Sequence, residues 1–303
     1  MVRGAKTADE LPIGFVNFFG RLSPEFNQRF LFDELLALMT SGHNVVSTVF
    51  AQCNRFFSTD CDPAFAPVGE TAVVRGIQAR FESGLYTNEY GSSLRGCAAG
   101  FGSCDLTLGP EKVEEVLRAH MATMPGFSGI RTGTFYDPDP ELGWETGPAR
   151  PVGWTVYESP KFREGFAVLE KLGLTFDHCG LHTQILPLVR RQSPLGGQGF
   201  WPPLSAVPAR SRGCVLAQVG LANDFPGVTI ICDHCGCPTM VGSYKNKRDE
   251  IFAQWKLDMA ELAKCPNVVV KVGGMTMPYS GFGWELRDAP PSSTELAEGL
   301  APW

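Results

Sequence analysis

The chain has 303 residues, and its 26 basic and 32 acidic side chains give a formal net charge of −6 at pH 7. With 44% hydrophobic and 19% charged residues it has the composition of a globular protein that is long enough to bury a sizeable core. Because the balance is acidic and no basic cluster interrupts it, the sequence disfavours nucleic-acid binding.

The N-terminal apolar stretch, residues 11–20, is interrupted by Asn17 and follows Asp9 and Glu10, which argues against a signal peptide or a membrane span there. Ten cysteines in a chain of this length are far fewer than disulfide-stapled secreted scaffolds contain, so reduced thiols are expected. We therefore expect a cytoplasmic protein that has no membrane partner.

Short apolar, β-branched runs alternate along the chain with amphipathic stretches, which is typical of a parallel βα architecture. The six runs span residues 44–53, 96–101, 127–131, 174–182, 228–234 and 267–273. Most are apolar at nearly every position, which predicts strands covered on both faces. Helical faces are predicted between the runs, formed by Phe30, Leu31, Leu35 and Leu38, by Phe162, Phe166, Leu169 and Leu172, and by Ile251, Phe252, Trp255, Met259 and Leu262.

Two segments depart from this alternation. Residues 190–213 are rich in Gly, Pro, Ser and Arg, and we interpret them as an insertion, either a surface loop or a stretch that the functional protein lacks. Residues 136–151 contain Asp-Pro and Gly-Pro turn signals and predict a long loop after the third run. Loops in that position often carry or cover a site.

The tetrapeptide Asp-His-Cys-Gly occurs at residues 177–180 and again at 233–236, each time at the C-terminal end of an apolar run. Folds of the βα type place their sites at these strand ends. Strand alternation then puts His182 and His234 at neighbouring strand ends, where imidazoles suit a divalent metal or proton transfer. Both are candidate catalytic residues and metal ligands; the alternative for either is an ordinary hydrogen-bonded core histidine.

Cys232, Cys235 and Cys237 allow a second interpretation, a zinc or redox site, because Cys-x-x-Cys can bring two thiolates together. A structural zinc site needs four ligands at one point, however, and the sequence has no second Cys-x-x-Cys. Alternation also directs Cys232 away from the other two. The histidine pair is therefore the preferred site.

Two cations, Arg131 and Lys271, lie in or at the end of apolar strands and must find an anion or reach solvent. Either a substrate carboxylate or a neighbouring acidic side chain would satisfy each of them. Gly273 and Gly274 follow directly, and they predict either a turn that lets the backbone approach a ligand or an ordinary turn.

Several segments together resemble the amidohydrolase-related branch of the amidohydrolase superfamily, in family order from about residue 28 to the C-terminus. They are SGHNVVSTVF (41–50), GIR (129–131), LHTQ (181–184), FPGVTIICDHCG (225–236), RDEIFAQW (248–255), NVVVKVGG (267–274) and FGW (282–284). The resemblance implies one α/β domain over residues 1–303 with a (β/α)8 TIM-barrel fold. Residues 190–213 are foreign to the family pattern.

The resemblance also implies a metal-dependent hydrolase that acts on a small lactone or amide bearing a carboxylate, with one divalent ion, zinc or manganese. By position, His182 and His234 resemble the family histidines after strands five and six, which would be catalytic groups and metal ligands. Arg131, Gln184 and Lys271 would bind the substrate. A small-molecule substrate and a homo-oligomer are the expected partners.

The chain departs from the family at both ends of the barrel. The His-x-His motif of strand one has no counterpart, because the histidines are His43, His120, His178, His182 and His234. The aspartate of strand eight has none either. We therefore expect an incomplete chain whose barrel lacks strands one and eight and has two open edges. Two functions stay open: a hydrolase, and a non-catalytic barrel-like protein that has lost its metal shell.

Overall fold

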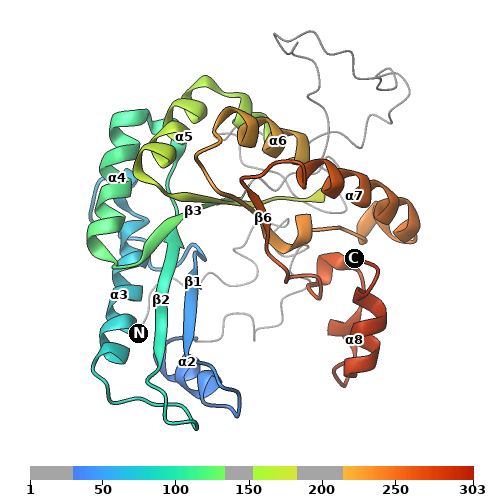
Figure 1. Cartoon of the computed structure of the whole chain (residues 1–303), viewed down its shortest axis with the longest axis horizontal. Coiled ribbons are helices and arrows are strands. Elements are labelled where there is room, and N and C mark those ends of the chain that lie inside the picture. Colours follow the sequence, from blue (N-terminus) through green and yellow to red (C-terminus); the bar gives the residue numbers. More distant parts are fainter. Residues whose placement is uncertain (1–29, 134–152, 183–213) are drawn as a thin grey trace. The chain divides into compact units, whose positions relative to one another are not determined.

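The structure is a computed structural model that describes residues 30–133, 153–182 and 214–303 (Figure 1). Gln184, the loop predicted at 136–151 and the insertion predicted at 190–213 lie outside the described residues. The rest packs as two compact units. Unit 2 holds the described residues of Pro24–Thr132 and Ser159–Asp177, and unit 1 holds those of Gly133–Glu158 and His178–Trp303. The single domain over residues 1–303 stays a prediction.

All six predicted runs form strands: β1 Ser47–Ala51, β2 Arg95–Gly102, β3 Phe127–Gly133, β4 Thr175–Cys179, β5 Ile230–Cys232 and β6 Val268–Val270. They follow one another in the sheet in the order of the sequence. The pairs β1–β2, β2–β3 and β5–β6 are parallel. Parallel strands in sequential order with helices between them are the architecture of a (β/α)8 barrel, of which the described residues supply six strands. The predicted α/β fold class is confirmed.

Helices connect and cover these strands: α2 Phe32–Met39, α3 Val68–Glu82, α4 Pro110–Thr123, α5 Pro160–Leu172, α6 Cys214–Asp224, α7 Arg248–Leu262 and α8 Ser293–Leu300. Helix α5 begins with Pro160, and Gly173 directly after it takes the left-handed conformation that favours glycine. In unit 2, α3 runs alongside β2 (Figure 1). Among the described residues, none of the helices has the length and apolar character needed to cross a membrane.

The buried face of α2 differs from the predicted one. Phe30 and Leu38 are exposed, whereas Phe32 and Met39 are buried, with Leu35 packed against them. The prediction was wrong because the helix begins only at Phe32. Leu35 and Met39 follow Phe32 by three and seven residues, which is the spacing of one face of an amphipathic helix. The stripe predicted for α7 is confirmed, because Ile251, Trp255 and Leu262 are buried and Phe252 and Met259 pack beside buried neighbours.

Coverage of the strands on both faces holds for β4, where four of the five residues are buried. This coverage is incomplete at β1 and β6, the first and last strands of the sheet. Val49 of β1 is 64% exposed, and Val269 of β6 is 50% exposed. The reason is that β1 and β6 each have a strand neighbour on one side only in the described part of the chain. These are the two open edges that the sequence predicted.

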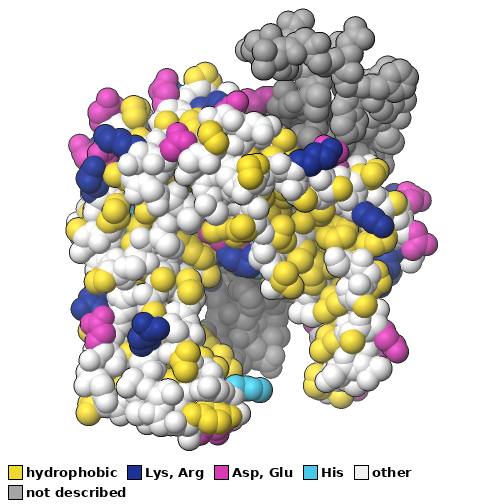
Figure 2. Space-filling model, viewed as in Figure 1, with side chains coloured by type: hydrophobic (Ala, Val, Ile, Leu, Met, Phe, Trp, Pro, Cys, Tyr) yellow, Lys and Arg dark blue, Asp and Glu magenta, His cyan; other side chains and the backbone are white. Residues whose placement is uncertain are grey.

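Charges on the surface are mixed. On the face shown in Figure 2, basic and acidic side chains alternate and neither sign gathers into a patch. Several pairs form ordinary surface salt bridges, such as Lys171 and Arg118 with Glu114. Such pairs contribute little to stability.

Two helical glycines give a matched test of packing. A Cβ added at Gly165 of α5 would lie 2.1 Å from the carbonyl oxygen of Leu106, whereas one added at Gly76 of α3 would meet nothing within 4 Å. We expect Gly165→Ala to lower the free energy of unfolding by about 1–3 kcal/mol. Gly76→Ala should raise it by about 1 kcal/mol, because alanine is the better helix former. Urea unfolding measures both changes, and equal effects would contradict the observed contact.

The buried side chain of His120 should make the stability of the fold depend on pH. The ring is buried, Nε2 faces the carbonyl oxygen of Ser103 at 3.1 Å, and Nδ1 faces the hydroxyl of Thr71 at 2.6 Å. A carbonyl only accepts, so Nε2 carries a proton. Burial lowers the pKa of His120 from 6.5 to about 4.

Between pH 6.5 and 4 the unfolded chain therefore binds more protons at His120 than the folded chain does, and stability falls as the pH falls. From pH 8 to pH 5 the loss is about 2 kcal/mol for this residue. Urea unfolding at the two pH values measures this loss. From pH 8 to pH 5, the free energy of unfolding of His120→Asn should fall by about 2 kcal/mol less than that of the wild type. His43→Asn is the control, because His43 lies on the exposed surface. Equal pH dependence in all three proteins would refute the assignment.

Candidate functional site at the ends of β4 and β5

The turn after β5 is left-handed over four consecutive residues. The φ angles are 55° at His234, 53° at Cys235, 76° at Gly236 and 48° at Cys237. Only glycine adopts such angles freely, and each of the other residues costs on the order of 1 kcal/mol. Backbone strain of this kind persists only where surrounding contacts enforce it, and it concentrates at functional sites.

Lys271 supplies three of the contacts that hold this turn. Its amide donates to the carbonyl of Cys232 at 2.9 Å, its carbonyl accepts from the amide of Cys235 at 3.2 Å, and its ammonium lies 2.7 Å from an oxygen of Asp233. Asp233 is buried, whereas the Lys271 side chain is 37% exposed. Of the two interpretations of Lys271, the structure shows the salt bridge; its role in binding substrate stays a prediction.

Trp255 secures the turn from the side of α7. Its indole nitrogen donates to the carbonyl of Cys235 at 2.7 Å. The amide of His182 donates to the carbonyl of Cys237 at 3.2 Å, which ties the turn to the segment after β4. These bonds satisfy backbone groups that a left-handed turn would otherwise leave buried without partners.

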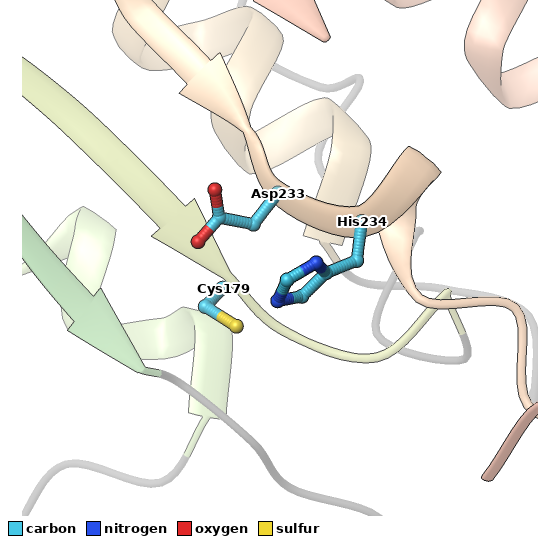
Figure 3. Close-up of side chains that lie close together, drawn as sticks. All are labelled: Cys179, Asp233 and His234. Carbon is cyan, nitrogen blue, oxygen red and sulfur yellow. The ribbon is translucent and has the colours of Figure 1, made fainter. Parts of the chain in front are cut away.

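Three side chains meet at this turn (Figure 3). Cys179 is the last residue of β4, and Asp233 and His234 follow β5. Their ligand atoms, the Sγ, a carboxylate oxygen and a ring nitrogen, all lie within 4.8 Å of one another. The sequence predicted His234 as part of a site but did not single out Cys179 or Asp233. The repeated Asp-His-Cys-Gly tetrapeptide was the available signal, since it contains all three residue types.

Hydrogen bonds favour the thiolate form of Cys179. Side-chain hydrogen bonding with Cys237, which is the largest effect, and with His234 lowers the pKa of Cys179 from 9.0 to about 6 against the opposing effect of burial. Burial and the same contact raise the pKa of Cys237. The pair therefore consists of a thiol that keeps its proton and a neighbouring sulfur that readily loses one.

The ring of His234 lies against Gly274. A Cβ at that position would come within 2.4 Å of Nδ1, so the ring could not occupy this place beside any other residue. The Gly-Gly sequence is therefore more than an ordinary turn, and the group that approaches its backbone is an imidazole of the same chain. Nδ1 of His234 is buried and has no hydrogen-bond partner among the described residues. No backbone donor fixes the tautomer of this ring.

His182 has the opposite environment. Its Nδ1 accepts a hydrogen bond from the amide of Thr239 at 2.8 Å, and Tyr244 packs edge-on against the ring. An amide only donates, so the proton of the neutral ring is on Nε2. Burial lowers the pKa of His182 to about 4, which keeps the ring neutral. In this state His182 offers an N–H rather than a lone pair, and its predicted roles as catalytic residue and metal ligand stay predictions.

His178, in the first copy of the repeat, is an ordinary core histidine. It is buried, and Nδ1 is hydrogen-bonded to the hydroxyl of Tyr157. Burial lowers its pKa to about 4.

The three-cysteine site does not form. Cys232 packs against Leu262, Cys235 lies 3.8 Å from the carbonyl of Lys271, and the thiol of Cys237 donates to the carbonyl of Asp233. Among the described residues, these thiols are not a group whose ligand atoms come together. The choice of the histidine site over the cysteine site is consistent with this arrangement.

In unit 2, Arg131 is held at the end of β1. Its Nε donates to Oε1 of Gln52 at 3.1 Å, and the guanidinium also donates to the Gln52 carbonyl. The ring of Phe101 lies 5.5 Å from the guanidinium carbon. The predicted role of Arg131 in binding substrate, like that of Gln184, stays a prediction.

The amidohydrolase family model matches residues 59–302. The chain belongs to the amidohydrolase family. No curated protein matches the sequence.

Solved amidohydrolase structures share the fold. An amidohydrolase from Burkholderia multivorans with HEPES bound is 16% identical, with a TM-score of 0.54 over 92% of this chain and 70% of that one. A second crystal form of an amidohydrolase from the same organism, with zinc bound, is also 16% identical. Its TM-score is 0.53 over 93% of this chain and 72% of that one. A probable 2-pyrone-4,6-dicarboxylic acid hydrolase from Acinetobacter baumannii with citric acid bound gives only 0.38, at 9% identity over 88% and 81%.

The ion pair between Lys271 and Asp233 should be a main support of the turn in this amidohydrolase. Lys271→Met leaves a buried carboxylate without its cation, and we expect a loss of about 1–3 kcal/mol in the free energy of unfolding, reduced by the partial exposure of the lysine. Adding Asp233→Asn should recover part of the loss. A double-mutant cycle in urea measures the coupling, and strictly additive effects would show that the pair contributes nothing.

Proposed function

We propose that this chain is a hydrolase of the amidohydrolase-related type, in which water attacks the carbonyl carbon of a small lactone or amide bearing a carboxylate. Membership of the family supports hydrolysis. The carboxyl ends of parallel strands, where such barrels carry out their chemistry, hold the cluster of Cys179, Asp233 and His234.

The observation that carries the proposal is the position of His234. Its ring lies against Gly274 on one side and beside a carboxylate and a thiol on the other, yet none of the described residues forms a hydrogen bond with its Nδ1. The lone pair of an imidazole can accept a proton from water or bind a cation. We assign it the central role in the reaction.

The cofactor we propose is one divalent ion, zinc or manganese, and the residues fit it. Asp233 offers a carboxylate oxygen and His234 a ring nitrogen from one turn. When bound, such an ion supplies a Lewis acid that polarises a carbonyl oxygen. Zinc bound in one of the Burkholderia multivorans structures supports a metal in this fold.

The other residues keep roles that their geometry allows. With its proton on Nε2, His182 acts as a hydrogen-bond donor toward the substrate. The ammonium of Lys271 has three donors, and its salt bridge to Asp233 leaves it partly exposed. We propose that this exposed side of Lys271 meets the carboxylate of the substrate.

Substitution of His234 tests the proposal. With the full chain and a panel of lactones and amides, with and without a carboxylate, we expect wild-type turnover on the carboxylate-bearing members. Activity should be abolished in His234→Ala, a fall of at least about a thousandfold if the group acts in proton transfer or binds the metal. His43→Ala, altered at an exposed surface position, should keep the wild-type rate.

Two results would count against this assignment. Wild-type turnover in His234→Ala would remove His234 from the reaction. Absence of hydrolysis across the whole panel would favour the alternative, a non-catalytic barrel-like protein of the amidohydrolase family.

A further inference from the structure

We infer that Cys179 is a thiolate ligand of the divalent ion, which makes the centre a mixed site of sulfur, oxygen and nitrogen donors. The inference rests on the proposed function in so far as that invokes a metal. Its first support is position: Sγ of Cys179, an oxygen of Asp233 and a nitrogen of His234 lie within 4.8 Å of one another (Figure 3). Donor atoms around tetrahedral zinc are about 3.5 Å apart, so small side-chain rotations would close the set.

The surroundings of Cys179 are those of a bound thiolate. The side chain is buried, with 7% of its surface exposed, and Cys237 lies beside it in the same buried cluster. The thiol of Cys237 donates to the carbonyl oxygen of Asp233 at 3.9 Å. Hydrogen bonds from outside the ligand set commonly orient and stabilise metal ligands. This arrangement makes Cys237 a supporting donor rather than a ligand.

The number and type of ligands indicate which metal binds. Three protein ligands leave one position of a tetrahedral ion open, as in catalytic zinc sites. Thiolates select zinc, whereas manganese prefers oxygen donors. Of the two metals that the sequence allowed, the presence of Cys179 selects zinc.

Cobalt substitution tests the inference without any substrate. The full chain is freed of metal with a chelator and titrated with Co²⁺, and binding through sulfur produces a thiolate-to-cobalt charge-transfer absorption in the near ultraviolet. We expect this band at one equivalent of Co²⁺ in the wild type and its loss in Cys179→Ser. Zinc should displace the cobalt, and its affinity should fall by about 100-fold or more in the variant, since loss of a supporting residue alone costs 10–100-fold.

Matched cysteine variants separate this site from others. Cys104→Ser, at a buried cysteine of unit 2 outside the cluster, should keep the band, and so should Cys235→Ser. Cys179→Ala serves as a second replacement if the serine variant unfolds, and circular dichroism monitors the fold of each protein.

Five outcomes are decisive. A cobalt spectrum without a thiolate band, a band that persists in Cys179→Ser and Cys179→Ala, or no binding of cobalt or zinc would each overturn the inference. A band lost in Cys235→Ser but kept in Cys179→Ser would also overturn it, in favour of the three-cysteine site. A band that depends on Cys179 in a protein that hydrolyses nothing would support the inference while the proposed function fails.

Discussion

Lys271 is the residue on which the arrangement of the site depends. Its amide contacts Cys232, its carbonyl contacts Cys235 and its ammonium contacts Asp233. The left-handed turn that follows β5 is intrinsically unfavourable, because three of its four residues have side chains. Fixed contacts must offset this cost, and the pairing of β5 with β6 brings Lys271 to the one place where it can supply them.

The strained turn has a direct consequence for the chemistry. It directs His234 back toward the end of β4, where its ring faces Cys179, instead of letting it continue along the strand (Figure 3). Gly274 completes the arrangement because the absence of a Cβ leaves room for the ring. The site is therefore built from three adjacent strand ends, those of β4, β5 and β6. Each contributes something different: a thiol, a strained turn, and a cation followed by a glycine.

The two histidines of the predicted pair show how hydrogen bonding sets the function of an imidazole. Both follow strands of the same sheet, but a backbone amide fixes the proton of His182 on Nε2. His234 has no such donor among the described residues. One ring is thereby suited to donate a hydrogen bond and the other to accept a proton or bind a cation. Their side chains are identical, so the difference comes entirely from what lies beside each Nδ1.

The sequence by itself determined the strands, their parallel sense and the strand ends at which chemistry is expected, because apolar runs and their spacing are local properties. It also located His234 and Lys271. Only the tertiary structure decided which partners meet: Cys179 rather than Cys232 or Cys235 lies beside His234, and the ammonium of Lys271 pairs with Asp233. The two copies of Asp-His-Cys-Gly are identical in sequence, yet one ends a regular strand and the other forms a left-handed turn. No local pattern specifies that difference, since the strain is offset by contacts with residues far away along the chain.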